Sequence, residues 1–250
     1  MSANSKPMAA LGTMTATEKW LLDSIMDHGI ITKETWVTPP PRRKWTATEM
    51  SSAMWSLTRR KIVVARPLHH GKTYFALSAS TVHKLGLPEN KGKELAEFAK
   101  LRVYAQLLFF TAYDKTAKRL RRDELAVRIA EPTHGLPQGF YARARKKNFL
   151  GFTRVDTHLS TLPMRSAQTL RHDVFRFVSL PSVRERIKNK TFEFTWITAT
   201  QDRADAVMQI FCGYDRIGKA PIRVIVMKEL VPLVCSVQFA DSLPFNPVET

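Results

Sequence analysis

The chain has 250 residues, of which 39 are lysine or arginine and 22 are aspartate or glutamate, so its formal net charge is +17. So strong a positive charge attracts polyanions, of which nucleic acid is the commonest and an acidic membrane surface the second. The two cysteines, Cys212 and Cys235, are too few for a disulfide framework and lack the paired spacing of a zinc site.

Hydrophobic residues make up 44% of the sequence, enough for a real core in one large domain or two smaller ones. Residues 1–13 lack the apolar segment of a signal peptide. The most apolar run, residues 103–112, falls far short of the ~20 residues that a membrane-spanning helix needs. With so few cysteines, a reducing compartment fits best. We therefore expect a cytoplasmic protein with no membrane association.

A flexible tail is expected over residues 1–14, followed by a first helix. Thr15 and Glu18 have the spacing of a capping box, in which each side chain accepts a hydrogen bond from the other residue's amide. Gly29 is a typical residue for ending that helix. The apolar positions that share one face of it are Trp20, Leu21, Ile25 and Met26.

The most informative stretch follows the proline break at residues 39–41. A second capping box, Thr46 to Glu49, opens a helix whose inward stripe is predicted to be Met50, Ala53, Met54 and Leu57. Two strand-like segments, residues 62–65 and 73–77, come next, joined by a turn that contains Gly71, and a closing helix covers residues 78–85. A helix that runs into a basic hairpin is typical of a winged helix-turn-helix, so we expect a DNA-binding domain over residues 15–90.

In such a domain the second helix enters the major groove, and its exposed side chains meet the base edges. The outward candidates are Thr48, Ser51, Ser52, Trp55 and Arg59. Arg59, or Arg60, is the best candidate for a bidentate contact to guanine. The predicted phosphate contacts are Arg42, Arg43 and Lys44 before the helix and Lys61, Arg66, His70 and Lys72 after it. Glu49 is the one acidic residue between positions 42 and 72.

Two plainer interpretations stay open for this stretch. The run from Arg59 to Lys61 also fits the solvated last turn of a helix, where cations favour the macrodipole. His69 and His70 could ligate a metal, but two adjacent histidines at a hairpin tip are more often a polar turn. We expect no metal and no cofactor.

A basic helical connector is expected over residues 91–139. It comprises a long helix at 94–113, a basic helix at 114–129 and a loop at 131–139 that is rich in proline and glycine. Its arginines Arg119, Arg121 and Arg122, with Arg143, Arg145, Lys146 and Lys147 just beyond it, are predicted to extend the phosphate footprint.

Residues 140–250 are expected to form an α/β domain, which makes the chain α+β as a whole. Strand-like segments at 152–159, 191–200 and 221–227 alternate with helical segments at 166–189, interrupted at Pro181, and at 202–211. Strands and helices that alternate in this way indicate βαβ units. An edge strand is also predicted at residues 233–239.

The order of elements over residues 15–85 resembles the winged-helix unit of plasmid replication-relaxation proteins and related mobile-element factors. The resemblance rests on the helix at 47–60, the hairpin at 62–77 and the segment Tyr74 to Ser78, and it covers about the first third of the chain. It implies a protein of a plasmid, phage or other mobile element, associated with that plasmid or with the nucleoid. Such a protein binds duplex DNA in replication, transfer or transcriptional control, as a dimer and with other replication or transfer proteins as possible partners.

Some of these factors carry a second domain that resembles a restriction endonuclease, which holds Mg²⁺ on acidic residues of neighbouring strands. The resemblance makes Asp156 and Glu193 the candidates here, although Thr195 stands where the motif has lysine. The domain is therefore expected to be degenerate, and binding is favoured over catalysis. A metal-dependent nuclease and a nonspecific nucleic-acid-binding protein remain as alternatives.

Overall fold

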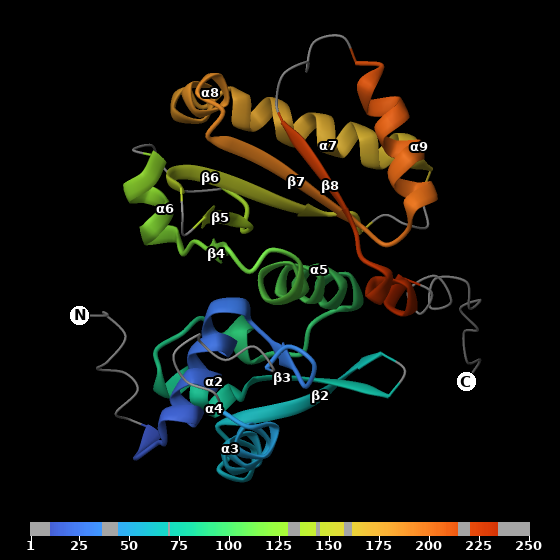
Figure 1. The fold of residues 1–250 in the computed structure, drawn as a ribbon. Helices are drawn as coiled ribbons and strands as arrows, with labels where there is room; N and C mark the ends of the chain where they lie inside the picture. Colours follow the sequence, from blue (N-terminus) through green and yellow to red (C-terminus); the bar gives the residue numbers. More distant parts are fainter. Residues whose placement is uncertain are drawn as a thin grey trace, which may run out of the picture. The chain divides into compact units, whose positions relative to one another are not determined.

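The protein is described from a computed structural model, which covers residues 11–36, 45–69, 71–129, 136–143, 146–157, 162–214 and 221–234. The chain is α+β, as predicted, and divides into two compact units, Met1–Lys115 and Thr116–Thr250 (Figure 1). The boundary lies inside the stretch for which we predicted a helical connector. Within the described ranges, no helix is long and apolar enough to cross a membrane.

The first unit combines helices with a small antiparallel sheet. Its elements are α2 (Ala16–His28), β1 (Ile31–Thr32), α3 (Ala47–Arg59), β2 (Val63–His69), β3 (Lys72–Leu77), α4 (Ala79–Lys84), η2 (Glu89–Gly92), α5 (Glu97–Leu108) and the π-helical turn η3 (Phe109–Tyr113). The strands pair in the order β1-β3-β2, and β2 and β3 form the predicted hairpin. The predicted helices at 47–60 and 78–85 are confirmed by α3 and α4.

Both predicted capping boxes are present and explain where α2 and α3 begin. Thr15 accepts a hydrogen bond from the amide of Glu18 at 3.1 Å, and its own amide donates to the Glu18 carboxylate at 2.8 Å. The corresponding distances for Thr46 and Glu49 are 3.2 Å and 2.7 Å. Each box satisfies two backbone amides that the helix itself leaves unpaired, and it places a negative charge at the positive end of the helix.

The core of the first unit is built from the inward faces of these helices and from the sheet. α2 contributes Leu21, Leu22 and Ile25, and α3 contributes the predicted stripe of Met50, Ala53, Met54 and Leu57. Tyr74 in β3 is fully buried, and its hydroxyl accepts a hydrogen bond from the Leu95 amide at 3.3 Å. Because the apolar side of α3 is committed to this core, its polar side is left for solvent or a partner.

Of the predicted basic helix at residues 114–129, only residues 122–129 are helical. The π-helical turn η3 ends at Tyr113, and β4 (Ala117–Arg119) and α6 (Arg122–Ile129) follow. The Glu124 carboxylate accepts a hydrogen bond from the Arg121 amide at 2.9 Å, which satisfies an unpaired donor at the start of α6. β4 pairs with β5 (Phe140–Arg143), so a long-range strand pairing overrides the local helical preference of these residues.

The second unit contains a five-stranded mixed sheet. Its further elements are β6 (Lys146–Val155), α7 (Pro163–Val178), α8 (Pro181–Lys188), β7 (Phe192–Thr198), α9 (Gln201–Cys212), β8 (Ile222–Val226) and η4 (Lys228–Leu230). The strand order is β4-β5-β6-β7-β8, in which β6, β7 and β8 are parallel. The two parallel connections confirm the predicted βαβ pattern. Residues 231–234 are helical, so the edge strand predicted from 233 is wrong there, and 235–239 lie outside the described residues.

Helices α7, α8 and α9 cover one face of this sheet (Figure 1). The core beneath them is aromatic. Phe152 lies 4.6 Å from Phe177 and 5.3 Å from Phe194, centroid to centroid, and Phe140 lies 5.2 Å from Phe177. Side chains alternate along a strand, so the residues between these phenylalanines point to the opposite face of the sheet.

Gly151 on that opposite face has no room for a side chain. A methyl group there would lie 2.1 Å from Cζ of Tyr141, whose hydroxyl is 2.8 Å from both Glu193 and Thr195. We expect Gly151→Ala to lower the free energy of unfolding by about 1–3 kcal/mol through overpacking, as measured by urea denaturation. The double variant Gly151→Ala/Tyr141→Leu should recover most of that loss. If the stability losses of the two single variants simply add in the double variant, the side chain added at position 151 does not collide with Tyr141.

Candidate nucleic-acid interface

Helix α3 presents a continuous polar stripe on the side away from the core. The residues of this stripe, spaced by three, four and seven positions, are Thr48, Ser51, Ser52, Trp55 and Arg59, and all five are exposed as predicted. Trp55 is 63% exposed, which is unusual for so large an apolar side chain. The stripe therefore carries small hydroxyl groups near the start of the helix and an aromatic ring with a cation near its end.

The guanidinium of Arg59 lies over the ring of Trp55, with its central carbon 5.2 Å from the ring centroid. A cation held over an indole face gains about 0.5–1 kcal/mol at an exposed site. The contact restricts both side chains, and both residues remain exposed. The end of the stripe is thus a preformed cationic and aromatic surface, which we call the Trp55–Arg59 pair.

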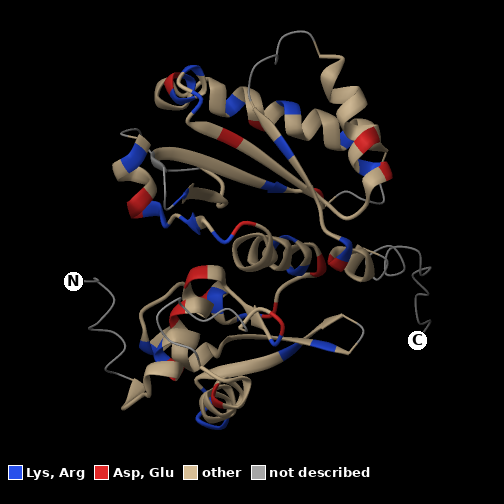
Figure 2. Ribbon diagram, in the orientation of Figure 1, with Lys and Arg blue, Asp and Glu red and all other residues tan. Residues whose placement is uncertain are grey.

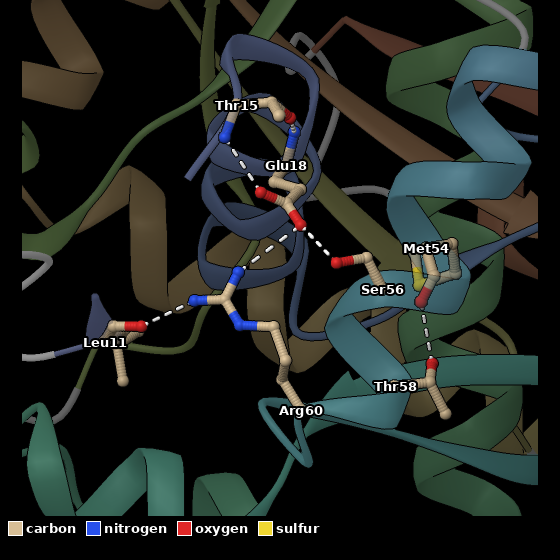
Figure 3. A network of polar contacts seen from close by, with 7 residues as sticks. All are labelled: Leu11, Thr15, Glu18, Met54, Ser56, Thr58 and Arg60. Atoms are coloured by element: carbon tan, nitrogen blue, oxygen red, sulfur yellow. Dashed lines mark hydrogen bonds and ion pairs between the residues drawn. The ribbon is translucent and has the colours of Figure 1, made fainter. Parts of the chain in front are cut away.

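The side chain of Arg60 points toward α2 (Figure 3). Its guanidinium donates to the carbonyl oxygen of Leu11 at 2.7 Å and lies 3.4 Å from the Glu18 carboxylate. Ser56 donates to the same carboxylate at 2.6 Å. The prediction that Arg60 could read guanine is therefore corrected: its donors hold α3 against α2, and Arg59 is the outward arginine.

Glu18 is the centre of this inward network. Burial would by itself raise the pKa of its carboxyl group, since a buried carboxylate loses hydration. Hydrogen bonds from the Ser56 hydroxyl and the Thr15 amide, with the positive charge of Arg60, outweigh that effect and hold the pKa below its ordinary value. The carboxylate is therefore ionised at neutral pH and joins the N-terminus of α2 to the C-terminal half of α3.

The predicted phosphate contacts of the hairpin behave differently from one another. Lys61 is exposed just after α3, in the left-handed backbone region with φ of 55°. Lys72 forms a long ion pair of 3.7 Å with Glu34, between two partly exposed side chains. Such a surface ion pair contributes little to stability, so Lys72 can exchange the Glu34 carboxylate for a phosphate. Arg66 is half-buried and donates to the Gly92 carbonyl at 2.7 Å, which corrects its assignment as a phosphate contact.

Four of the DNA contacts predicted around α3 and the hairpin have no described position. Arg42, Arg43, Lys44 and His70 lie outside the described residues. The idea that His69 and His70 share a metal therefore has no geometry to support it. Among the residues that the structure describes, no three or more histidine, cysteine, aspartate or glutamate side chains are grouped to hold a metal ion.

The remaining predicted phosphate contacts belong to the second unit. Arg121 and Arg122 are exposed at the start of α6, and Arg119 donates to the Gln138 side chain at 3.0 Å. Arg143 is mostly buried, pairs with Glu193 at 2.9 Å and lies over the ring of Phe149, so its assignment as a phosphate contact is corrected. Arg145 lies outside the described residues. Lys146 and Lys147 belong to β6, but their side chains are also outside the described part.

The two carboxylates considered for a metal site do not come together. β6 and β7 pair in parallel with Gly151 opposite Glu193, so Glu193 lies on the sheet face away from the helices. Asp156 follows β6 on the helix-covered face, where Ser166 of α7 and Arg203 of α9 bind its carboxylate at 2.8 Å and 3.0 Å. Five strand residues separate the two positions, or about 16 Å. The two carboxylates therefore do not form the shared Mg²⁺ site that the nuclease alternative requires.

Comparisons with protein-family models, with curated proteins and with solved structures found no match to this chain. The function must therefore be argued from the residues and their geometry.

Two features of functional interest were missed by the sequence reasoning. The capping-box prediction identified Glu18 but not its tertiary role, because Ser56 and Arg60 are 38 and 42 positions away. The outer face of α7 was also passed over, although Arg171 and Phe175 have the four-residue spacing that brings side chains together on a helix.

Proposed function

We propose that the first unit is a winged-helix domain that binds duplex DNA, with α3 in the major groove and the β2–β3 hairpin as the wing. The order of helix, strand, helix and hairpin supports this assignment, as does the antiparallel sheet with the order β1-β3-β2. The family resemblance stated above would place the protein on a mobile element, in replication, transfer or transcriptional control. A two-fold DNA site would call for a homodimer.

The single observation that carries the proposal is the exposed stripe of α3 with the Trp55–Arg59 pair. Small hydroxyl side chains allow a helix to approach the floor of the groove closely, and an arginine can make two hydrogen bonds to guanine. Glu49, the one carboxylate of α3, lies in its first turn and is held by Thr46. Nothing acidic on α3 therefore faces a ligand near Arg59. The basic hairpin residue Lys72 adds a contact that is independent of sequence.

The test begins with selection of bound duplexes from a random library, followed by fluorescence anisotropy on a selected and a scrambled duplex. Arg59→Ala should weaken binding to the selected duplex by about 1–3 kcal/mol more than to the scrambled one, because it removes a base contact. Arg59→Lys should lose the same selectivity, since lysine keeps the charge but not the planar fork. Lys72→Ala should weaken both duplexes alike and lower the salt slope by about one.

Lys19→Ala is the matched control, because it removes an exposed charge from α2 outside the α3 stripe. It should change neither affinity nor selectivity by more than about twofold. Equal losses for Arg59→Ala and Lys19→Ala on both duplexes would contradict base reading by α3. Failure of the selection to enrich any sequence would favour a nonspecific nucleic-acid-binding protein instead.

A further inference from the structure

The outer face of α7 in the second unit carries cations and an aromatic ring but no exposed carboxylate. Asp173 is the one acidic residue of this helix, and it is buried and paired with Arg154 at 3.2 Å. Arginine positions recur along α7 (Figure 2). The exposed residues of the helix include Met164, Arg165, Gln168, His172, Phe175 and Arg176. A helix face of this composition repels other cations and attracts a polyanion.

The centre of this face is an arginine held between two aromatic rings. The guanidinium carbon of Arg171 lies 4.5 Å from the ring centroid of Tyr214, which follows α9, and 5.6 Å from that of Phe175. The Tyr214 hydroxyl in turn donates to the sulfur of Met164 at 3.5 Å. These contacts restrict the guanidinium and place it over one face of the Phe175 ring, and Phe175 remains 45% exposed. We call this arrangement the α7 platform.

We propose that the α7 platform binds single-stranded DNA, with an unpaired base stacked on Phe175 and the flanking phosphates held by Arg165, Arg171 and Arg176. A half-exposed aromatic ring offers its face to a base, and only an unpaired base can stack on it, because bases within a duplex are already stacked. The neighbouring arginines supply the positive charge that binds the phosphate backbone. The choice of DNA rather than RNA rests on the proposed function of the first unit, which would bring the second unit to DNA.

The experiment measures binding of the full-length protein to fluorescein-labelled dT20 by anisotropy. Phe175→Ala should weaken this binding about fivefold or more, the equivalent of one lost base–aromatic stack, and should change duplex affinity less than about twofold. Phe98→Ala is the matched control, since Phe98 is 46% exposed on α5 in the first unit and should leave dT20 binding unchanged. Phe175→Tyr keeps the ring and should retain the affinity.

Several outcomes would overturn the proposal. Equal effects of Phe175→Ala and Phe98→Ala, or an equal loss of duplex and dT20 binding, would leave no role for stacking. Binding of rU20 at least as tight as that of dT20 would overturn the assignment to DNA. Loss of binding to phosphatidylserine vesicles in Phe175→Ala, with dT20 binding unchanged, would indicate a membrane surface.

The experiments distinguish failure of the α7 platform from failure of duplex binding by α3. Arg59→Ala on α3 should leave dT20 binding unchanged, because it lies in the first unit. If duplex selection fails while Phe175→Ala still weakens dT20 binding, the α7 platform stands without the winged-helix assignment. If Arg59→Ala removes duplex selectivity while Phe175→Ala has no effect on dT20, the platform is wrong and the duplex site stands.

Discussion

Replacement of Glu18 by alanine is expected to lower the free energy of unfolding of the first unit by about 2–4 kcal/mol. The change removes the acceptor of the Thr15 amide, a hydrogen bond worth about 0.5–1.5 kcal/mol, and the charged acceptor of the Ser56 hydroxyl, worth about 1.5–3 kcal/mol. It also leaves Arg60 beside α2 without the carboxylate that lies 3.4 Å away. Hydrogen exchange of the amides of α2 and α3 measures the loss within this unit, apart from the rest of the chain.

Glu49→Ala is the matched control, since the same four residues, Thr-Ala-Thr-Glu, open both α2 and α3. Glu49 is exposed and holds Thr46 in the same way, but no tertiary contact depends on the bonds described for it. Glu49→Ala should therefore lower the free energy of unfolding by less than Glu18→Ala does, because it removes only the bonds of the capping box. Equal losses at the two positions would contradict the view that Glu18 joins α2 to α3.

The effect of Glu18 should also depend on pH. Its pKa in the folded protein is below the ordinary value of 4.5, so ionised Glu18 favours the folded state above that pH. The stabilisation is lost as the pH falls through the folded pKa, because both states then bind the proton. The difference in stability between the parent protein and Glu18→Ala should thus be full at pH 7 and shrink below about pH 4. A difference that stays constant down to pH 2 would show that the charge has no part in it.

Local features of the fold were accessible from the sequence, and long-range features were not. The capping boxes and the inward stripe of α3 are encoded within about ten residues, so they could be predicted. The exposed Trp55–Arg59 pair follows from the same periodicity. The strand β4 could not be predicted in this way: it is three residues long, and α6 lies between it and its partner β5 in the sequence. Its existence depends on a partner strand rather than on its own composition.

The side-chain assignments that failed did so for a related reason. Arg59 and Arg60 are adjacent in the sequence and equivalent in charge, yet only the second meets Glu18. Asp156 and Glu193 were both placed correctly on or beside strands. Their separation onto opposite faces depends on the register between β6 and β7, and a shift of one residue would have reversed it. Strand register is a tertiary property that a single sequence does not show.

Replacement of Arg203 by methionine is expected to destabilise the second unit by about 3–5 kcal/mol, the usual effect of removing one partner from a buried ion pair. The side chains of Asp156 and Arg203 are 1% and 9% exposed. Arg203 also donates to the Ser166 hydroxyl at 2.8 Å, which itself donates to Asp156. The N-cap of α9 survives the change, because Thr200 accepts from the backbone amide of residue 203. Urea denaturation followed by hydrogen exchange of α7 and α9 measures the effect.

The double variant Asp156→Asn/Arg203→Met should recover part of this loss, because it leaves no buried charge without its partner. Arg165→Met, an exposed arginine of α7, is the control and should change stability by less than about 0.5 kcal/mol. The same variants test the nuclease alternative. If Asp156 serves to balance Arg203, then Mn²⁺ should leave the melting temperature of the parent protein unchanged. A rise in melting temperature with Mn²⁺ that Asp156→Asn abolishes would show instead that this carboxylate binds metal.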